Sequence, residues 1–263
     1  MVNPKKYVGI LCVMLYTMIN FSVPCLADNT LIFGSVSGSP PLSYEEDGVA
    51  KGFFLDVFRE TAKRAGYDIS FVCYPMKRLE TNLQSGRIDG TVHITHTKKR
   101  DEFLIYSTAP VLSGISLVFV KKGREFTFKT ISDLYGKRIG VILGFKVMNE
   151  EFEKAVQQGK IITESVSTHD QNLKKLLAGR IDCLIGTENL TWYHANELDL
   201  AKHLVALAHP IADIFVYFAI SKHTKNIPDP LAVMRDMNAA LESTKSDGTY
   251  ETLLKKYKLL LFE

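Results

Sequence analysis

Thr95, Thr97 and Arg100 stand close together after a β-like run, and their side chains suit the binding of a carboxylate. A guanidinium presents two parallel N–H donors to a carboxylate, and neighbouring hydroxyls complete its hydrogen bonds. Arg100 also ends the basic run 98–100, and runs of charge usually lie on a solvated surface. The residues alone therefore leave two interpretations open, an anion clamp and an exposed arginine.

The other chemistry-bearing residues form no recognisable catalytic or metal-binding set. The sequence has seven histidines, of which His93 and His96 are three residues apart. On a strand, an odd spacing places two side chains on opposite faces, and no cluster of Cys or His accompanies this pair. The sequence also lacks the glycine-rich phosphate loops and nucleophile turns that identify many enzymes. We therefore expect no metal and no cofactor.

A seven-residue pattern occurs twice in the chain, about 93 residues apart. Residues 83–89 and 176–182 both read Leu-x-x-Gly-Arg-Ile-Asp. In each copy an amphipathic run ends at a glycine that suits a left-handed helix terminus, and an apolar strand-like run follows the aspartate. The repeat predicts two similar lobes, and small ligands commonly bind between lobes. A chance match between common loop residues is the alternative.

Strand-like and helix-like patterns alternate in both halves of the chain. The first half predicts strands at 31–36, 69–73 and 90–95 and helices at 54–65 and 76–83. The second half predicts strands at 139–143, 161–166 and 183–187 and helices at 147–156 and 169–177. Such alternation is typical of parallel sheets with helices on both faces, so we expect an α/β fold.

Two further apolar runs, 115–120 and 214–220, suit extended connectors between the lobes. Helices at 231–244 and 249–257 follow, and Asp247 suits the cap of the last one. Two crossings of this kind make a hinge. We predict a two-lobed α/β protein in which each lobe is a mostly parallel sheet flanked by helices. Lobe one comprises residues 28–118 and 216–263, and lobe two comprises residues 119–215.

Residues 1–27 have the features of a secretory signal peptide. Two lysines precede an uncharged run over 7–21 that is shorter than a membrane-spanning helix. We expect cleavage after Ala27; acylation of Cys25 is the alternative, which Pro24 disfavours. No later stretch is long and apolar enough to anchor the chain, so we expect an exported, periplasmic protein.

The net charge bears on the class of binding partner, and the cysteine content bears on disulfide bonding. The formal net charge of +3 includes Lys5 and Lys6 of the signal, so the remainder is close to neutral, which disfavours a nucleic-acid partner. Cys73 and Cys183 are the cysteines outside the signal, and they lie in apolar runs of different halves. We expect two buried free thiols, because disulfide-stapled secreted domains are usually short and rich in cysteine.

Six short motifs occur in an order that is itself informative. Their residues are Pro41, Leu42, Ser43 and Tyr44 with Gly52, Phe53, Phe54, Leu55 and Asp56; the Leu-x-x-Gly-x-x-Asp step at 83–89; Thr95, Thr97 and Arg100; Tyr106, Ser107 and Pro110; Gly136, Lys137, Ile139, Gly140, Val141 and Gly144; and Asp247, Gly248, Thr249 and Tyr250. In this order they resemble the extracellular solute-binding proteins of family 3, which serve ABC importers of polar amino acids. The resemblance spans nearly the whole chain after the signal.

The resemblance implies a type II periplasmic-binding-protein fold whose two lobes close on a small carboxylate-bearing solute, an amino acid or a related compound. The closed form would be presented to the membrane permease of an ABC importer. It also implies that Arg100 binds the carboxylate of the solute with Thr95 beside it, which favours the clamp over the exposed arginine. We expect a monomer that is not an enzyme.

Lobe two departs from the family pattern at two places. Where the family usually supplies an aspartate for the ammonium group of the ligand, this chain has Thr187. Glu188 follows, but alternation along a strand directs its side chain to the opposite side. Gly144 keeps the backbone amides of the family's anion-binding turn, whereas Phe145 replaces a threonine. The ring of Phe145 either contacts the solute or packs in the core.

Lobe one departs where Ser39 stands in place of an aromatic residue, and Met76 lies where the family often has tryptophan. The predicted ligand-binding residues are Arg100, Thr95, His93, Gly144, Phe145, Thr187, Glu188, Ser39 and Met76. A solute with one carboxylate and little positive charge fits this set better than lysine or arginine does.

Two other functions stay open for this sequence. Cyclohexadienyl dehydratase-like enzymes share the fold and need an acid or base in the cleft, for which Glu188 and Lys146 are the candidates. A sensory module of the same fold would act through a separate membrane partner, because the sequence contains no kinase or glycosidase segment.

Overall fold

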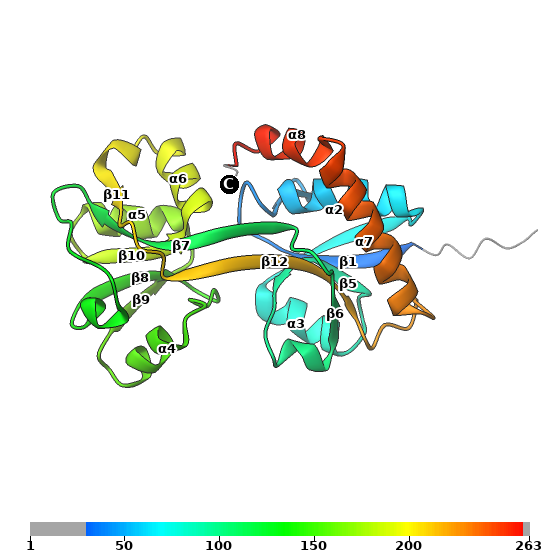
Figure 1. Ribbon diagram of the computed structural model, residues 1–263, viewed down its shortest axis with the longest axis horizontal. Helices are drawn as coiled ribbons and strands as arrows, with labels where there is room; N and C mark the ends of the chain where they lie inside the picture. Colours follow the sequence, from blue (N-terminus) through cyan, green and yellow to red (C-terminus); the bar gives the residue numbers. More distant parts are fainter. Residues whose placement is uncertain (1–29, 260–263) are drawn as a thin grey trace, which may run out of the picture.

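The computed structural model describes residues 30–259, which form two lobes joined by a pair of long strands (Figure 1). The predicted signal, residues 1–27, lies outside the described residues. Lobe one contains β1 (Leu31–Val36), β2 (Tyr44–Glu46), β3 (Val49–Lys51), α2 (Phe53–Ala65), β4 (Ile69–Tyr74), α3 (Met76–Gln84), β5 (Gly90–Thr95), η2 (Arg100–Glu102), β6 (Leu104–Tyr106), α7 (Pro230–Ser246) and α8 (Thr249–Lys256). Lobe two contains η3 (Ile131–Leu134), β8 (Arg138–Ile142), α4 (Glu150–Gln157), β9 (Ile162–Val166), α5 (His169–Leu177), β10 (Cys183–Thr187), α6 (Glu188–Glu197), η4 (Ala201–His203) and β11 (Leu204–Ala206). The strands β7 (Leu112–Lys121) and β12 (Ala212–Ser221) belong to both lobes.

One sheet runs through both lobes in the order β4-β1-β5-β12-β7-β10-β8-β9. Three strands at each end, β4-β1-β5 and β10-β8-β9, are parallel to one another. The two central strands pair antiparallel with each other and with the inner strand of each trio. The predicted α/β fold with a mostly parallel sheet in each lobe is confirmed, and the connectors turn out to be part of the same sheet.

The connectors β7 and β12 are ten residues long each and pair from Ala212↔Ser116 to Val216↔Leu112. Figure 1 shows them running side by side from one lobe to the other. After β12 the chain stays in lobe one, where the Asp56 carboxylate on α2 accepts hydrogen bonds from Tyr257 and Lys256 at the end of α8, at 2.7 and 2.6 Å. The C-terminal helices therefore close lobe one. The division of the lobes at residues 118 and 216 stays a prediction.

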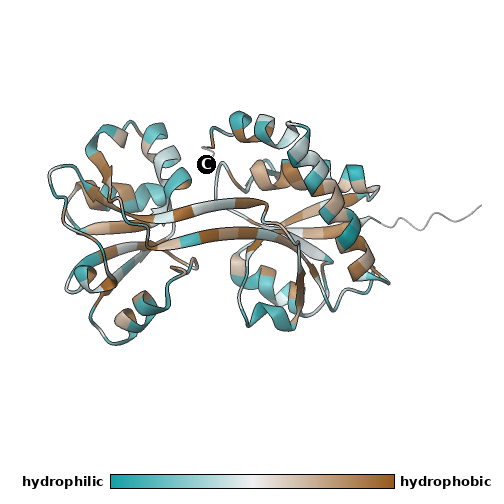
Figure 2. Ribbon diagram, in the orientation of Figure 1, coloured by the Kyte–Doolittle hydropathy of each residue, from teal (hydrophilic) through white to brown (hydrophobic). Residues whose placement is uncertain are grey.

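Each lobe has a hydrophobic core on both faces of its part of the sheet. Along β7, for example, Val118 and Val120 face one cluster of buried side chains in lobe two, and Leu117 and Phe119 face another. This two-residue alternation is what a strand covered by helices on both faces requires. Figure 2 shows the result: the central strands are mostly brown, and the outward turns of the helices are mostly teal.

Both glycines of the repeated pattern have the left-handed backbone that the sequence predicts. Gly86 has φ of +65° and Gly179 has φ of +70°, and each directly follows the C-terminal cap of its helix. The next residues, Arg87 and Arg180, donate their backbone N–H groups back to the last helical turn, as helix-ending glycine motifs do. Gly86 is further constrained, because a Cβ there would lie 1.9 Å from the carbonyl oxygen of His223.

The aspartates of the repeat also do the same work in both lobes. The Asp89 carboxylate accepts the backbone N–H of Ile32 on β1 at 2.8 Å, and the Asp182 carboxylate accepts that of Arg138 on β8 at 2.7 Å. Each backbone N–H of the two aspartates returns a bond to the carbonyl of the same strand residue. Each aspartate therefore ties the start of its own strand to the first strand of its lobe.

The structure corrects one helix start and one helix cap. The helix predicted at 147–156 begins at Glu150, because the side chain of Asn149 caps it by accepting the backbone N–H of Phe152 at 2.9 Å. Residues 143–149 are therefore a loop. The last helix has Gly248 rather than Asp247 at its N-cap, although the Asp247 carboxylate accepts the first backbone N–H of that helix at 3.0 Å.

Cys73 and Cys183 are free thiols, as predicted, and Cys183 is fully buried while Cys73 is half-buried. Burial raises the pKa of the Cys183 thiol to about 12. Within residues 30–259, none of the helices has both the length and the apolar character that a membrane crossing requires.

Candidate functional site

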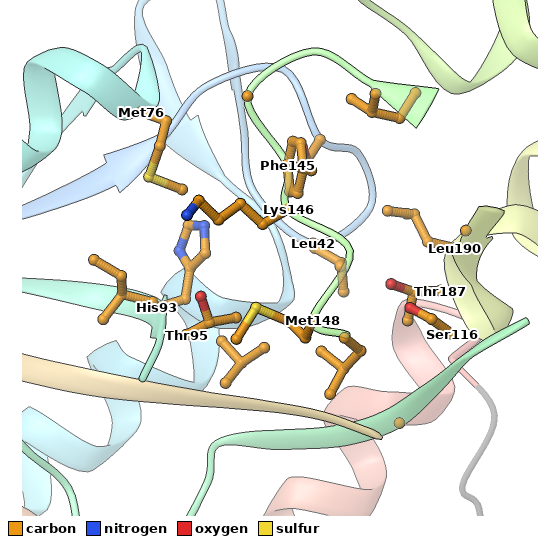
Figure 3. Close-up of a pocket in the computed structure, with 18 of the residues that line it drawn as sticks. Leu42, Met76, His93, Thr95, Ser116, Phe145, Lys146, Met148, Thr187 and Leu190 are labelled. Carbon is orange, nitrogen blue, oxygen red and sulfur yellow. The ribbon is translucent and has the colours of Figure 1, made fainter. Parts of the chain in front are cut away.

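A cavity of about 370 Å³ lies between the two lobes. The hinge strands form part of its wall through Leu112, Ser116 and Val216. Figure 3 shows Met76, His93 and Thr95 of lobe one on one side and Thr187 and Leu190 of lobe two on the other. The cavity therefore stands where relative movement of the lobes changes its size.

Arg100 reaches this cavity from the 3-10 turn η2, just after β5. Its Nη1 donates to the carbonyl oxygen and to the hydroxyl of Thr95, at 2.7 and 2.8 Å. Its Nε and Nη2 both donate to one carboxylate oxygen, Oε1 of Glu80, at 2.8 and 2.5 Å. The Arg100 side chain is 13% exposed. The guanidinium is thus in the cavity wall, as the clamp interpretation requires, but it is already paired.

Glu80 and Arg100 meet because two short elements place them together. Glu80 lies one helical turn after Met76 on α3, so both side chains are on the face of the helix that lines the cavity. Arg100 follows the carboxyl end of β5, the strand next to β1 at the centre of lobe one. The pair joins the helix to the loop after the strand.

His93 lies in the same wall and is held by an aromatic stack. Its ring lies 4.6 Å from that of Phe54 with an angle of 6° between the planes. Burial lowers the pKa of His93 to about 3, so the imidazole is neutral near neutral pH. Its Nδ1 is buried without a hydrogen-bond partner among the described residues. His93 can therefore add a hydrogen bond but no charge to the site.

Ser39 and Met76 are the other two predicted binding residues of lobe one that line the cavity. Ser39 is buried and forms an isolated bridge with Ser43. The Met76 sulfur lies 3.9 Å from Nη2 of Arg100. His96, three residues after His93, is outside the cavity lining and pairs with Asp101 at 2.7 Å. The two histidines therefore have different environments: His93 is on β5, and His96 lies just after the end of that strand.

Lobe two presents a loop and the end of a strand. Gly144, with φ of +84°, turns the chain after β8, and Phe145, Lys146 and Met148 follow it along the cavity (Figure 3). Phe145 is 50% exposed, so its ring is not part of the core. Thr187, the last residue of β10, also lines the cavity.

Glu188 does not line the cavity. The strand ends at Thr187, and Glu188 is the first residue of α6, so alternation along a strand does not govern its direction. The next two residues, Asn189 and Leu190, line the cavity instead. Burial raises the pKa of the Glu188 carboxyl. Of the nine predicted binding residues, this is the one that the structure leaves outside the cavity lining.

His169, at the start of α5, is a cavity residue that the sequence pattern did not indicate. Its ring stacks on that of His194 at 4.8 Å, and His194 pairs with Asp170 at 2.9 Å. Burial, with His194 as a second cause, lowers the pKa of His169 to about 3. Like His93, it faces the cavity without a charge near neutral pH.

The cavity walls are largely apolar. Besides the residues above, the aliphatic and aromatic side chains that line them are Leu42, Phe54, Ile94, Leu112, Val141, Ile142, Val147, Ile185, Leu190, Ile214 and Val216. The ionisable side chains other than the two histidines are Lys77, Glu80, Arg100 and Lys146. A charged group of a ligand therefore has few ionisable partners in the cavity, and most of the ligand surface contacts carbon atoms.

Glu80 is the most important residue that the sequence pattern missed. The only available signal was its spacing of four from Met76 on a predicted helix, which puts both on one face. That spacing does not reveal an arginine 20 residues later in the chain. Tertiary structure brings the two together.

The chain belongs to the bacterial extracellular solute-binding proteins of family 3, whose family model matches residues 31–259. The L-cystine-binding protein TcyJ of Escherichia coli (strain K12) is 30% identical over 237 residues, which cover 87% of this chain and 82% of that protein. The resemblance drawn from the six motifs and the predicted class of protein, a solute-binding receptor, are confirmed.

Solved structures agree on the fold. A histidine kinase sensor domain with similarity to periplasmic binding proteins has a TM-score of 0.71 at 20% identity, covering 87% of this chain and 95% of that one. AncCDT-1, an ancestral amino acid-binding protein and precursor of cyclohexadienyl dehydratase, has a TM-score of 0.68 at 23% identity, with coverage of 87% and 95%. At these identities the likeness shows the type II periplasmic-binding-protein fold and nothing finer.

Proposed function

We propose that this chain is an exported receptor that binds an amino acid or a related small carboxylate between its lobes and delivers it to the permease of an ABC importer. The observation that carries this proposal is the guanidinium of Arg100, held by Thr95 in the wall of a cavity between two hinged lobes. A planar fork of donors in a largely buried site is the group of choice for a carboxylate. The curated relative that binds L-cystine supports the same class of ligand.

We further propose that the body of the solute is apolar and uncharged. The walls are mostly aliphatic and aromatic, and both cavity histidines are neutral near neutral pH. Thr187 places a hydroxyl, not a carboxylate, on the lobe-two side. A cationic side chain such as that of lysine or arginine would be desolvated there, and the one acidic side chain of the lining, Glu80, is already paired with Arg100.

The binding proposal is tested by isothermal titration of residues 28–263 with a panel of amino acids that includes leucine, methionine, phenylalanine, cystine, glutamate and arginine. A true ligand also raises the melting temperature, because it binds the folded state selectively. Arg100→Ala is expected to weaken binding at least a hundredfold, since two charge-assisted hydrogen bonds are lost. Arg59→Ala is the matched control, because Arg59 pairs with Asp56 on the surface and lies outside the cavity lining. Unchanged binding by Arg100→Ala contradicts the clamp.

No particular observation favours the enzymatic or sensory alternatives. A dehydratase needs an acid or base at the leaving group, and of the two candidates Glu188 is outside the cavity lining while Lys146 is on its exposed loop. Incubation of the purified protein with prephenate checks this point directly. Formation of phenylpyruvate contradicts a purely binding role.

A further inference from the structure

Glu80 and Thr95 together accept nearly all the N–H donors of the Arg100 guanidinium. Nη1 donates to Thr95, and Nε and one N–H of Nη2 donate to Glu80. Among the described residues, the remaining Nη2 proton has no partner besides the Met76 sulfur, at 3.9 Å. A solute carboxylate that needs two parallel donors therefore finds no free edge of Arg100.

The Nε–Nη2 edge is the one that can be released. Glu80 contacts both donors through the same oxygen, Oε1, so it makes a less complete pair than a carboxylate that offers one oxygen to each donor. Its side chain is 35% exposed, which allows it to rotate into water. Thr95, by contrast, holds Nη1 partly through its backbone carbonyl, which cannot move away.

We propose that Glu80 is an internal competitor for Arg100 and sets the affinity and specificity of the cleft. This inference rests on the proposed binding function. In the empty cleft Glu80 neutralises and orients the guanidinium. A solute carboxylate takes the Nε–Nη2 edge with both of its oxygens, and Glu80 turns out to solvent.

Such an exchange selects free carboxylates. An amide or ester offers one neutral acceptor and does not replace the charge that Glu80 withdraws, so it does not displace the side chain. A solute carboxylate replaces the negative charge of Glu80 and offers a separate oxygen to each of the two donors. The free energy of releasing Glu80 reduces the binding free energy of every solute. Removing the charge of Glu80 is therefore expected to tighten the binding of all carboxylates that fit the cavity.

The test compares Glu80→Gln and Glu80→Ala with the unmodified chain by isothermal titration against the amino acid panel and against leucinamide and 4-methylpentanoate. We expect the dissociation constant of a panel acid to fall at least tenfold in both variants, or 1.4 kcal/mol. Without added solute we expect both variants to melt at a lower temperature, because Arg100 loses its partner. Glu60→Gln is the matched control: Glu60 pairs with Arg64 at 2.8 Å on α2, outside the cavity lining, and binding is expected to be unchanged.

The outcomes separate the two proposals. If the unmodified chain binds a panel acid and the Glu80 variants bind it equally or more weakly, competition is refuted while the binding function stands. A loss for amino acids with no loss for 4-methylpentanoate also refutes it, because Glu80 would then hold the ammonium group of the solute. If neither the unmodified chain nor the variants bind any acid, both proposals fail.

Discussion

The two aspartates of the repeat make a matched pair for a stability experiment. Both tie the first strand of their lobe through one backbone N–H, but their surroundings differ. Asp89 is fully buried and also accepts hydrogen bonds from Thr224 and from Asn226, the latter at 3.3 Å. Asp182 is 45% exposed, and its remaining partner is the side chain of Arg138 at 3.7 Å.

We expect Asp89→Ala to lower the free energy of unfolding by about 4–5 kcal/mol, the low end of the range for three hydrogen bonds to a charged group. Hydrogen bonds to a charged group contribute about 1.5–3 kcal/mol each, and three donors lose their acceptor in a site that water cannot easily refill. Asp182→Ala is expected to cost only about 1 kcal/mol, because water replaces the carboxylate and an exposed ion pair contributes about 0–1 kcal/mol.

Urea unfolding of both variants, followed by far-ultraviolet circular dichroism, measures the difference. The slope against urea is expected to stay unchanged, since the surface exposed on unfolding is the same. Losses that agree within about 0.5 kcal/mol, or a greater loss for Asp182→Ala, refute the claim that burial, and not the shared motif, decides the energetic role of these aspartates.

Two further predictions concern the cavity. Because the pKa of His169 is about 3 in the folded protein and about 6.5 in the unfolded chain, the unfolded state binds the extra proton between these values, so stability falls as the pH is lowered from 6.5 towards 3. His169→Gln should make the free energy of unfolding, measured by urea titration, less pH-dependent by up to about 1.4 kcal/mol per pH unit; a pH dependence equal to that of the unmodified chain refutes the burial of a neutral His169. Phe145→Ala is expected to leave the free energy of unfolding within about 0.5 kcal/mol but to weaken solute binding about tenfold, since its ring is half exposed until the lobes close. Phe215→Ala, on β12 and outside the lining, is the control, and equal effects on binding contradict a role for Phe145 in closure.

Much of the fold was predictable because its signals are local. Residues 83–89 and 176–182 specify a helix end, a left-handed glycine and a strand in both lobes, and these depend on contacts within a few residues. The start of α4 was missed because apolar residues at 147 and 148 continue a helix-like pattern. Asn149 breaks it by capping the helix that follows.

The candidate site was predictable in position but not in chemistry. The order of the motifs indicated that Arg100 and Thr95 lie together, and the structure puts both in the cavity wall. It does not put Glu188 there: β10 ends at Thr187, as predicted, and Glu188 is the first residue of α6. The apolar character of the walls also was not evident, since it comes from side chains of many separate elements.

The sequence by itself determined two similar α/β lobes, two extended connectors and a repeated helix end with a left-handed glycine, because each of these follows from short-range patterns. Only the tertiary structure decided how the copies differ. The segment that follows β12 returns over the first copy and buries Asp89, whose bond to Thr224 spans 135 residues. It likewise decided that Arg100 meets Glu80 across 20 residues. Partners so far apart in the chain are chosen by packing, which no local pattern specifies.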